Sequence, residues 1–202
     1  LDPARSIRRQ MFDSLEKLGI ASSRRYAFAC EKLAQVGFTQ PEAILEQYPF
    51  QLSGGMAQRV TIALALCSKA KLLIADEPTN GLDQDSKRQT LSLLKNLFPD
   101  AAKLIITHDI SVAAACDRIL VLCGGRMLET GISSEVLAVP YQPYTKALLG
   151  ALVENEMQET PALREELGFC PFYRRCPLAM ELCRTEMPQR KANDREWWCC
   201  AE

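Results

Sequence analysis

The first fifty residues place apolar side chains at the period of a helix. Four of them recur at spacings of four, four and three and predict the buried face of an amphipathic helix: Ile7, Met11, Leu15 and Leu18. Gly19 is expected to end this helix. A second helix is predicted over residues 23–36 with Gly37 as its stop, and a third from Pro41, because proline is favoured at the first helical position. Residues 5–50 are therefore expected to be helical.

From residue 54 onward helices and strands alternate. Helices are predicted over 55–68, 85–97 and 110–115, and strands over 71–76, 103–107 and 118–122. The runs Leu72–Ala75 and Leu104–Thr107 are continuously apolar, which is typical of strands buried on both faces of a parallel sheet. The pattern thus indicates an α/β fold with a mostly parallel sheet flanked by helices.

The remaining third of the chain carries weaker signals. Gly124 and Gly125 predict a hairpin turn into a short strand over 126–129, which Gly131 closes. Helices are expected over 133–139 and 143–153. Residues 154–165 are polar and contain a proline, so they are interpreted as a linker before a cysteine-rich tail.

Composition and charge narrow the class of protein. The 202 residues are 48% apolar and 24% charged, which is ordinary for a globular chain. The net charge of -1 argues against nucleic acid or a membrane surface as a partner. No apolar run approaches the ~18 residues of a transmembrane helix, so any membrane association is expected to go through a partner protein.

Two motifs carry candidate chemistry. Ser53-Gly54-Gly55 opens a predicted helix, where serine is commonly a helix cap, but where paired glycines and free N–H groups also attract phosphate. Asp76 and Glu77 end a predicted buried strand, the position at which open α/β sheets bind ligands. Two adjacent carboxylates there indicate a functional role, because burying charge without a partner is costly. A helix N-cap at the end of the strand is the other interpretation.

At this spacing, residues 52–59 and 72–78 resemble the signature motif and the Walker B strand of an ATP-binding-cassette (ABC) ATPase. The resemblance implies ATP hydrolysis with Mg²⁺. Ser53, Gly54 and Gly55 would contact the γ-phosphate of ATP held by a partner subunit, and Gln58 would support that loop. Asp76 would hold Mg²⁺ through its water shell, and Glu77 would polarise the attacking water.

Two further segments fit the same family. Asn80-Gly81-Leu82-Asp83 resembles the D-loop of the dimer interface, although Asp83 is also suited to cap the following helix. His108 is the only histidine and ends a predicted strand about thirty residues after Walker B. A lone histidine there is often a surface residue, but the resemblance identifies it as the switch histidine that holds the catalytic glutamate and water.

Residues 140–149 narrow the family further. Their sequence PYQPYTKALL resembles the P-x-H-P-Y-T-x-x-L-L segment of oligopeptide, dipeptide and nickel importer ATPases, with Gln142 where histidine is usual. Phe50 likewise replaces a common histidine before the signature. The resemblance implies a subunit at the cytoplasmic face of the membrane, paired with a second ABC ATPase and two permease subunits, and served indirectly by an external solute-binding protein.

Nine cysteines are unevenly placed. Four are scattered and are interpreted as small core side chains: Cys30, Cys67, Cys116 and Cys123. Five crowd the tail: Cys170, Cys176, Cys183, Cys199 and Cys200. A cytosolic ATPase favours metal ligands over disulfides, so the first four of these are predicted to bind a [4Fe–4S] cluster or Zn²⁺, with Cys200 an alternative to Cys199. Unmetallated thiols packed near Trp197 and Trp198 are the other interpretation.

The sequence lacks the G-x-x-x-x-G-K-[ST] loop that cradles phosphate in such enzymes. The chain is therefore expected to be the later part of an ABC nucleotide-binding domain with a P-loop NTPase-like fold. Residues 1–50 would belong to its α-helical subdomain, 51–153 to the ATPase core, 154–165 to a linker and 166–202 to a Cys-rich extension. The alternatives are a non-transport ABC ATPase or a catalytically incomplete, metal-binding regulatory fragment.

Overall fold

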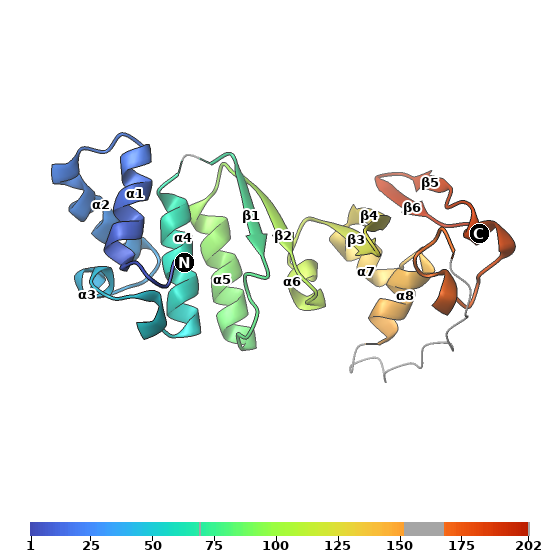
Figure 1. The fold of residues 1–202 in the computed structure, drawn as a ribbon. Helices are drawn as coiled ribbons and strands as arrows, with labels where there is room; N and C mark the ends of the chain where they lie inside the picture. Colours follow the sequence, from blue (N-terminus) through green and yellow to red (C-terminus); the bar gives the residue numbers. More distant parts are fainter. Residues whose placement is uncertain (69, 152–167, 202) are drawn as a thin grey trace. The chain divides into compact units, whose positions relative to one another are not determined.

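A computed structural model describes residues 1–68, 70–151 and 168–201 (Figure 1). The chain divides into two units, Leu1–His108 and Asp109–Glu202. The predicted linker over 154–165 and the end of the helix predicted over 143–153 lie outside the described residues. In the described part of the chain, no helix is long and apolar enough to span a bilayer.

The first unit begins with three helices, α1 (Ile7–Lys17), α2 (Ser22–Gln35) and α3 (Pro41–Leu45). Positive φ angles of 76° at Gly19 and 91° at Gly37 confirm the two predicted helix stops. The predicted apolar face of α1 was one residue too long, because Leu18 is the C-terminal cap and is exposed, whereas Ile7, Met11 and Leu15 are buried.

The rest of this unit alternates helix and strand: α4 (Gly54–Leu66), β1 (Leu72–Asp76), α5 (Gln84–Leu97) and β2 (Ala102–Ile106). The strands β1 and β2 pair in parallel, with Leu72 opposite Ala102 and Asp76 opposite Ile106, which confirms the predicted parallel pairing. Leu73 and Ala75 pack on the core that α4 and α5 contribute to.

The prediction that both faces of these strands are buried is wrong for this structure. Leu72, Ile74, Leu104 and Ile106 are between 48% and 59% exposed. They alternate with the covered residues, so they lie on the opposite face of the sheet. The helices α4 and α5 lie against one face only (Figure 1), and the described residues of this unit leave the other face open.

The second unit contains α6 (Ile110–Ala114), β3 (Arg118–Cys123), β4 (Arg126–Ile132), α7 (Ser133–Ala138) and α8 (Pro143–Gly150). After residue 168 come two 3-10 turns and the strands β5 (Gln189–Ala192) and β6 (Arg195–Trp198). The four strands form one antiparallel sheet in the order β3-β4-β6-β5.

The hairpin prediction needs a correction at Gly131. Strand β4 does not end there but continues to Ile132, and Gly131 pairs with Ile119. A Cβ atom at Gly131 would stand 2.9 Å from Val136 Cγ2 and 3.0 Å from Arg195 Cγ. The glycine therefore permits the close approach of a helix and of strand β6.

The β5–β6 hairpin was not predicted. Its two-residue turn, Asn193-Asp194, places Asn193 at a φ of 54°, the left-handed conformation that such turns require. The Asn-Asp pair was thus a usable signal, but the flanking residues are largely charged and do not have the apolar alternation of a strand.

Candidate active site

Glu77 is held at the end of β1 by the residue that follows the neighbouring strand. Its Oε1 atom accepts a hydrogen bond from the backbone N–H of His108 at 3.1 Å and lies 2.7 Å from Nδ1 of the His108 ring. The two residues predicted to be catalytic are thus in direct contact. The His108 side chain is 77% exposed and that of Glu77 32%, so the pair remains open to a substrate.

The strand geometry explains this contact. Parallel strands end at the same edge of a sheet, and the backbone N–H of Glu77 donates to the Ile106 carbonyl at 2.8 Å. Glu77 then adopts a φ of 46°, which is uncommon for a residue with a Cβ. This left-handed residue redirects the chain directly after β1, and its strain is typical of a functional site.

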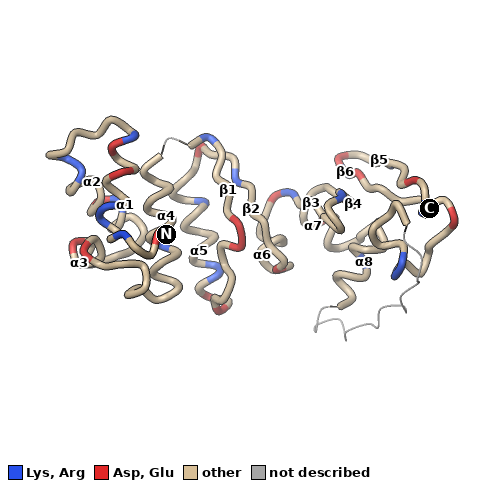
Figure 2. The backbone as a smooth tube through the Cα atoms, in the orientation of Figure 1, with Lys and Arg blue, Asp and Glu red and all other residues tan. Residues whose placement is uncertain are grey.

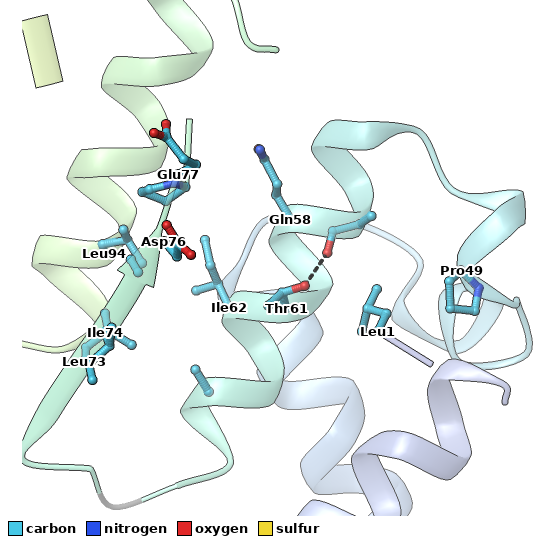
Figure 3. Close-up of a pocket in the computed structure, with 14 residues that line it drawn as sticks. Leu1, Pro49, Gln58, Thr61, Ile62, Leu73, Ile74, Asp76, Glu77 and Leu94 are labelled. Carbon is cyan, nitrogen blue, oxygen red and sulfur yellow. Dashed lines mark hydrogen bonds between the residues drawn. The ribbon is translucent and has the colours of Figure 1, made fainter. Parts of the chain in front are cut away.

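Asp76 lines a cleft of about 420 Å³ between α4 and β1. Its lining includes Thr61 and Ile62 of α4 and Leu73 of β1, and most of the lining residues are apolar. Figure 3 shows the Asp76 side chain turned toward α4 and the Glu77 carboxylate turned away from it. The two carboxylates form the acidic end of β1 in Figure 2.

The predicted phosphate-binding motif opens α4. The Ser53 side chain accepts a hydrogen bond from the backbone N–H of Met56 at 3.3 Å, so Ser53 is the helix cap, and Gly54 and Gly55 form the first turn. No hydrogen bond among the described residues joins Ser53 to Asp76 or Glu77. Farther along the same helix, Ala57 and Gln58 line the cleft that Asp76 and Glu77 also line.

Gln58 links α4 to the loop after β1. Its Nε2 donates to the backbone carbonyl of Asn80 at 3.5 Å, while its Oε1 is buried without a hydrogen-bond partner in the described part of the chain. Asp83 caps α5, since it accepts hydrogen bonds from the backbone N–H groups of Asp85 and Ser86. These bonds and that from the Ser86 hydroxyl lower the pKa of Asp83 below its usual value.

The tail cysteines gather in one place. Cys170, Cys176, Cys183, Cys199 and Cys200 are all buried, and four of them share an apolar cluster with Phe172 and Tyr173. Burial raises the pKa of Cys176 to about 11 and that of Cys200 to about 12, so these thiols are neutral at pH 7.

This packing does not fit the predicted metal centre. Across residues 1–68, 70–151 and 168–201, no three His, Cys, Asp or Glu side chains lie close enough together to hold a metal ion. The four predicted ligands, Cys170, Cys176, Cys183 and Cys199, are therefore unsupported as an iron–sulfur or zinc site. Cys170, Cys176 and Cys183 share the apolar cluster with Cys200, whereas Cys199 is buried but is not a member of that cluster.

The structure also shows a buried ion pair that the sequence did not reveal. Glu129 on β4 is fully buried, and its Oε1 accepts hydrogen bonds from Arg195 on β6 through Nε at 3.1 Å and Nη2 at 2.5 Å. The same carboxylate accepts from the backbone N–H groups of Tyr141 and Gln142. Gln142 is buried as well, and its side chain caps α8.

Comparison with known proteins agrees with the motifs. A family model for ABC transporters matches residues 1–80, and a model for the oligopeptide/dipeptide transporter C-terminal region matches residues 128–183. The probable peptide ABC transporter ATP-binding protein y4tR of Sinorhizobium fredii is 36% identical over 93% of this chain and 60% of its own length. The dipeptide transport ATP-binding protein DppD of Escherichia coli is 38% identical over 93% of this chain and 62% of its own length.

The fold is likewise that of a known cassette. The dimeric structure of MJ0796, a bacterial ABC transporter cassette, is 30% identical with a TM-score of 0.58, and covers 66% of this chain and 59% of its own. The chain spans about three fifths of the length of the two curated relatives. The signature, the Walker B strand and both family models agree that the chain is similar to ABC transporter ATP-binding proteins of the oligopeptide/dipeptide class.

Proposed function

We propose that this chain supplies the hydrolytic carboxylate and the signature helix of an ATP-binding subunit that powers peptide import across the cytoplasmic membrane. The observation that carries the proposal is the position of Glu77, fixed by both the backbone and the ring of His108. A carboxylate held in this way at the end of a parallel strand is suited to orient a water molecule and to accept its proton.

Glu77 is the general base in this proposal, and His108 is its positioning partner. The Nδ1–H of His108 donates to Oε1, which leaves the second carboxylate oxygen for the attacking water. Thr107 adds a weak contact to that second oxygen, at 3.5 Å. Because the base is fixed before ATP arrives, little reorganisation is needed when the water attacks.

Asp76 is the proposed ligand of Mg²⁺, through the ion's water shell. A carboxylate that faces a cleft at a strand end has the oxygen chemistry that Mg²⁺ prefers. Bound Mg²⁺ would neutralise charge that develops on the phosphate groups. In this proposal Asp76 binds the water shell of Mg²⁺, and Glu77 orients the attacking water.

The N-terminus of α4 is proposed to bind the γ-phosphate of ATP held by a second ABC ATPase. Ser53, Gly54 and Gly55 present the first N–H groups of the helix, and the helix dipole favours an anion there. Gln58 and Asp83 are proposed to keep the adjoining loop in place for that contact.

The 202 residues contain no phosphate-cradling G-x-x-x-x-G-K-[ST] loop. We therefore assign hydrolysis to an assembly in which other residues supply that loop. The proposed assembly has a second ATPase subunit and two permease subunits, lies at the cytoplasmic face of the membrane and is served by an external solute-binding protein. Within it, 1–50 is the helical subdomain, 51–153 the ATPase core and 166–202 a small Cys-rich extension.

The proposed cargo is a peptide. The names of the relatives refer to peptide, dipeptide and oligopeptide transport, and the matched C-terminal region belongs to the same class. Nickel was an equal candidate from the sequence, but none of the relatives compared is named for it. Uptake of radiolabelled di- and oligopeptides, with nickel as a competitor, distinguishes the two cargoes.

The test of the base is Glu77→Gln in the gene product that contains this chain, assembled with its transporter. Glutamine keeps the shape but cannot take a proton, so turnover is expected to fall at least about 100-fold while ATP affinity stays within about threefold. His108→Ala is expected to lower kcat by about tenfold or more, since it frees the carboxylate. The control is the exposed residue Glu42 in α3: Glu42→Gln is expected to leave turnover and ATP affinity unchanged. Turnover of Glu77→Gln within about tenfold of the parent would contradict the assignment.

A further inference from the structure

Two aromatic rings stand exposed immediately before α4. Phe50 is 74% exposed and Tyr48 39%. Their ring centroids are 5.6 Å apart at an interplanar angle of 23°, so the rings are stacked. In the described part of the chain Phe50 is thus mostly uncovered, although a ring of this size ordinarily stabilises a protein by being buried.

The turn that carries the rings is closed by two hydrogen bonds. Residues Pro49–Gln51 form a single 3-10 turn. The backbone N–H of Gln51 donates to the Tyr48 carbonyl at 2.9 Å, and the Gln51 side chain accepts from the Tyr48 N–H at 2.8 Å. The two bonds close the turn from both sides, so the aromatic pair is a preformed platform that loses little entropy on binding a ligand.

The platform precedes the proposed phosphate contact by three residues. After the turn, Leu52 and Ser53 are extended, and Ser53 caps α4. Phe50 therefore stands about 9 Å along the chain from Ser53, taking about 2 Å per residue in a 3-10 turn and up to 3.6 Å in an extended segment. Two phosphates and a ribose separate the γ-phosphate of ATP from its base, so a residue that stacks on the base must stand several residues away from the one that binds the phosphate.

We propose that Phe50, supported by Tyr48, stacks on the purine base of the ATP whose γ-phosphate meets Ser53. The proposal rests on the proposed function, because the nucleotide belongs to the second ATPase subunit. In the sequence, Gln47 and Gln51 flank the pair and Pro49 lies between the two rings. A stable protein contact needs a broad apolar patch, whereas two stacked rings match the size of one planar base.

The experiment measures the half-saturating ATP concentration for nucleotide-dependent association with the partner ATPase, in the gene product that contains this chain. Phe50→Ala is expected to raise it about 5- to 10-fold, the lower part of what a base–aromatic stack contributes. Phe50→Trp restores the parent value, while Phe50→Leu, which fills similar volume without a π-face, does not. Tyr26→Ala removes another exposed aromatic from the same unit and serves as the unchanged control.

The outcomes separate the two proposals. Ser53→Ala without effect on ATP-dependent association overturns the phosphate contact and therefore the proposed function. If Ser53→Ala weakens ATP-dependent association and Phe50→Ala leaves it unchanged, only the stacking is overturned. Rescue by Phe50→Leu, or a lower melting temperature of Phe50→Ala with unchanged ATP response, shows that protein covers Phe50 and also overturns the stacking. If Phe50→Ala loses only the stimulation of ATP hydrolysis by the permease, the platform contacts the permease and the stacking is overturned.

Discussion

At the scale of single residues, the conformation of Glu77 is as informative as its chemistry. Its φ of 46° lies in the left-handed region, where a side chain with a Cβ costs roughly 1–2 kcal/mol. The cost is offset because this conformation brings the carboxylate to the N–H and the ring of His108. A strained residue that places a carboxylate in this way is consistent with a functional role for that carboxylate.

This strain predicts an unusual order of stability between two substitutions. Glu77→Ala and Glu77→Gly both remove the carboxylate, but only glycine relieves the left-handed strain. Glu77→Gly is therefore expected to be more stable than Glu77→Ala by about 1 kcal/mol, the reverse of their order in ordinary strands. Urea denaturation of the two variants measures the difference, and a more stable alanine variant would show that the residue is unstrained.

At the scale of elements, a single buried ion pair joins β4 to β6. Glu129 and Arg195 contact each other with almost no exposure to water, and Arg195 also donates to the Val139 carbonyl. These bonds attach the C-terminal hairpin to the strand that follows Gly125. The hairpin is also held by the edge contact of Trp197 with the Tyr141 ring, at 4.8 Å between centroids, and by a hydrogen bond from Arg118 to the Asp194 carbonyl.

Removing one member of the pair is expected to be costly. Arg195→Met leaves the Glu129 charge buried and should destabilise the protein by about 3–5 kcal/mol, while the double variant with Glu129→Gln recovers part of that loss because no charge remains. Lys191→Met is the matched control: it breaks the exposed contact with Glu196 and should cost less than about 1 kcal/mol. A loss in the double variant equal to the sum of the Arg195→Met and Glu129→Gln losses would show that the pair contributes no coupling.

The buried thiols predict a loss of stability in alkali. Burial raises the pKa of Cys176 from 9.0 to about 11 and that of Cys200 to about 12. The folded state keeps protons that the unfolded chain releases, so this contribution is intact below pH 9 and is lost as the pH rises from 9 to 12. Urea midpoints measured across that range should fall, and less steeply in Cys176→Ala. Thiolate absorbance at neutral pH would contradict neutral thiols and would favour a bound metal.

At the scale of the whole molecule, the β1–β2 sheet, which is covered on one face only, is expected to promote self-association. Four large aliphatic side chains line its open face, an arrangement that promotes association with other apolar surfaces. The 202-residue chain is therefore expected to self-associate as its concentration rises. Ile74→Thr combined with Leu104→Thr should weaken that association in sedimentation measurements without lowering the melting temperature by more than a few degrees.

The covered face provides the control for this prediction. Leu73 packs into the core on the opposite side of the same strand, so Leu73→Thr should lower the melting temperature strongly. If Leu73→Thr is tolerated as well as Ile74→Thr, the two faces of the sheet do not differ as described.

The sequence by itself determined what depends on neighbours along the chain. The period of apolar residues located α1 to α5, glycines marked the ends of α1 and α2, and the strand pattern put Asp76 and Glu77 at one strand end and His108 at the next. The motifs also identified the family, because their order and spacing are specific. These features follow from local backbone preferences and from the period of the side chains, which do not depend on contacts with distant segments.

Only the tertiary structure decided what depends on distant residues. It placed Glu77 2.7 Å from His108, left one face of the β1–β2 sheet open and joined Glu129 to Arg195 across 66 positions. It also buried all five tail cysteines, without bringing three of them close enough to hold a metal ion in the described part of the chain. The physical reason is common to all four features: burial, ion pairing and ligand geometry depend on which segments meet in space. The residue pattern of one segment does not specify which other segment it will contact.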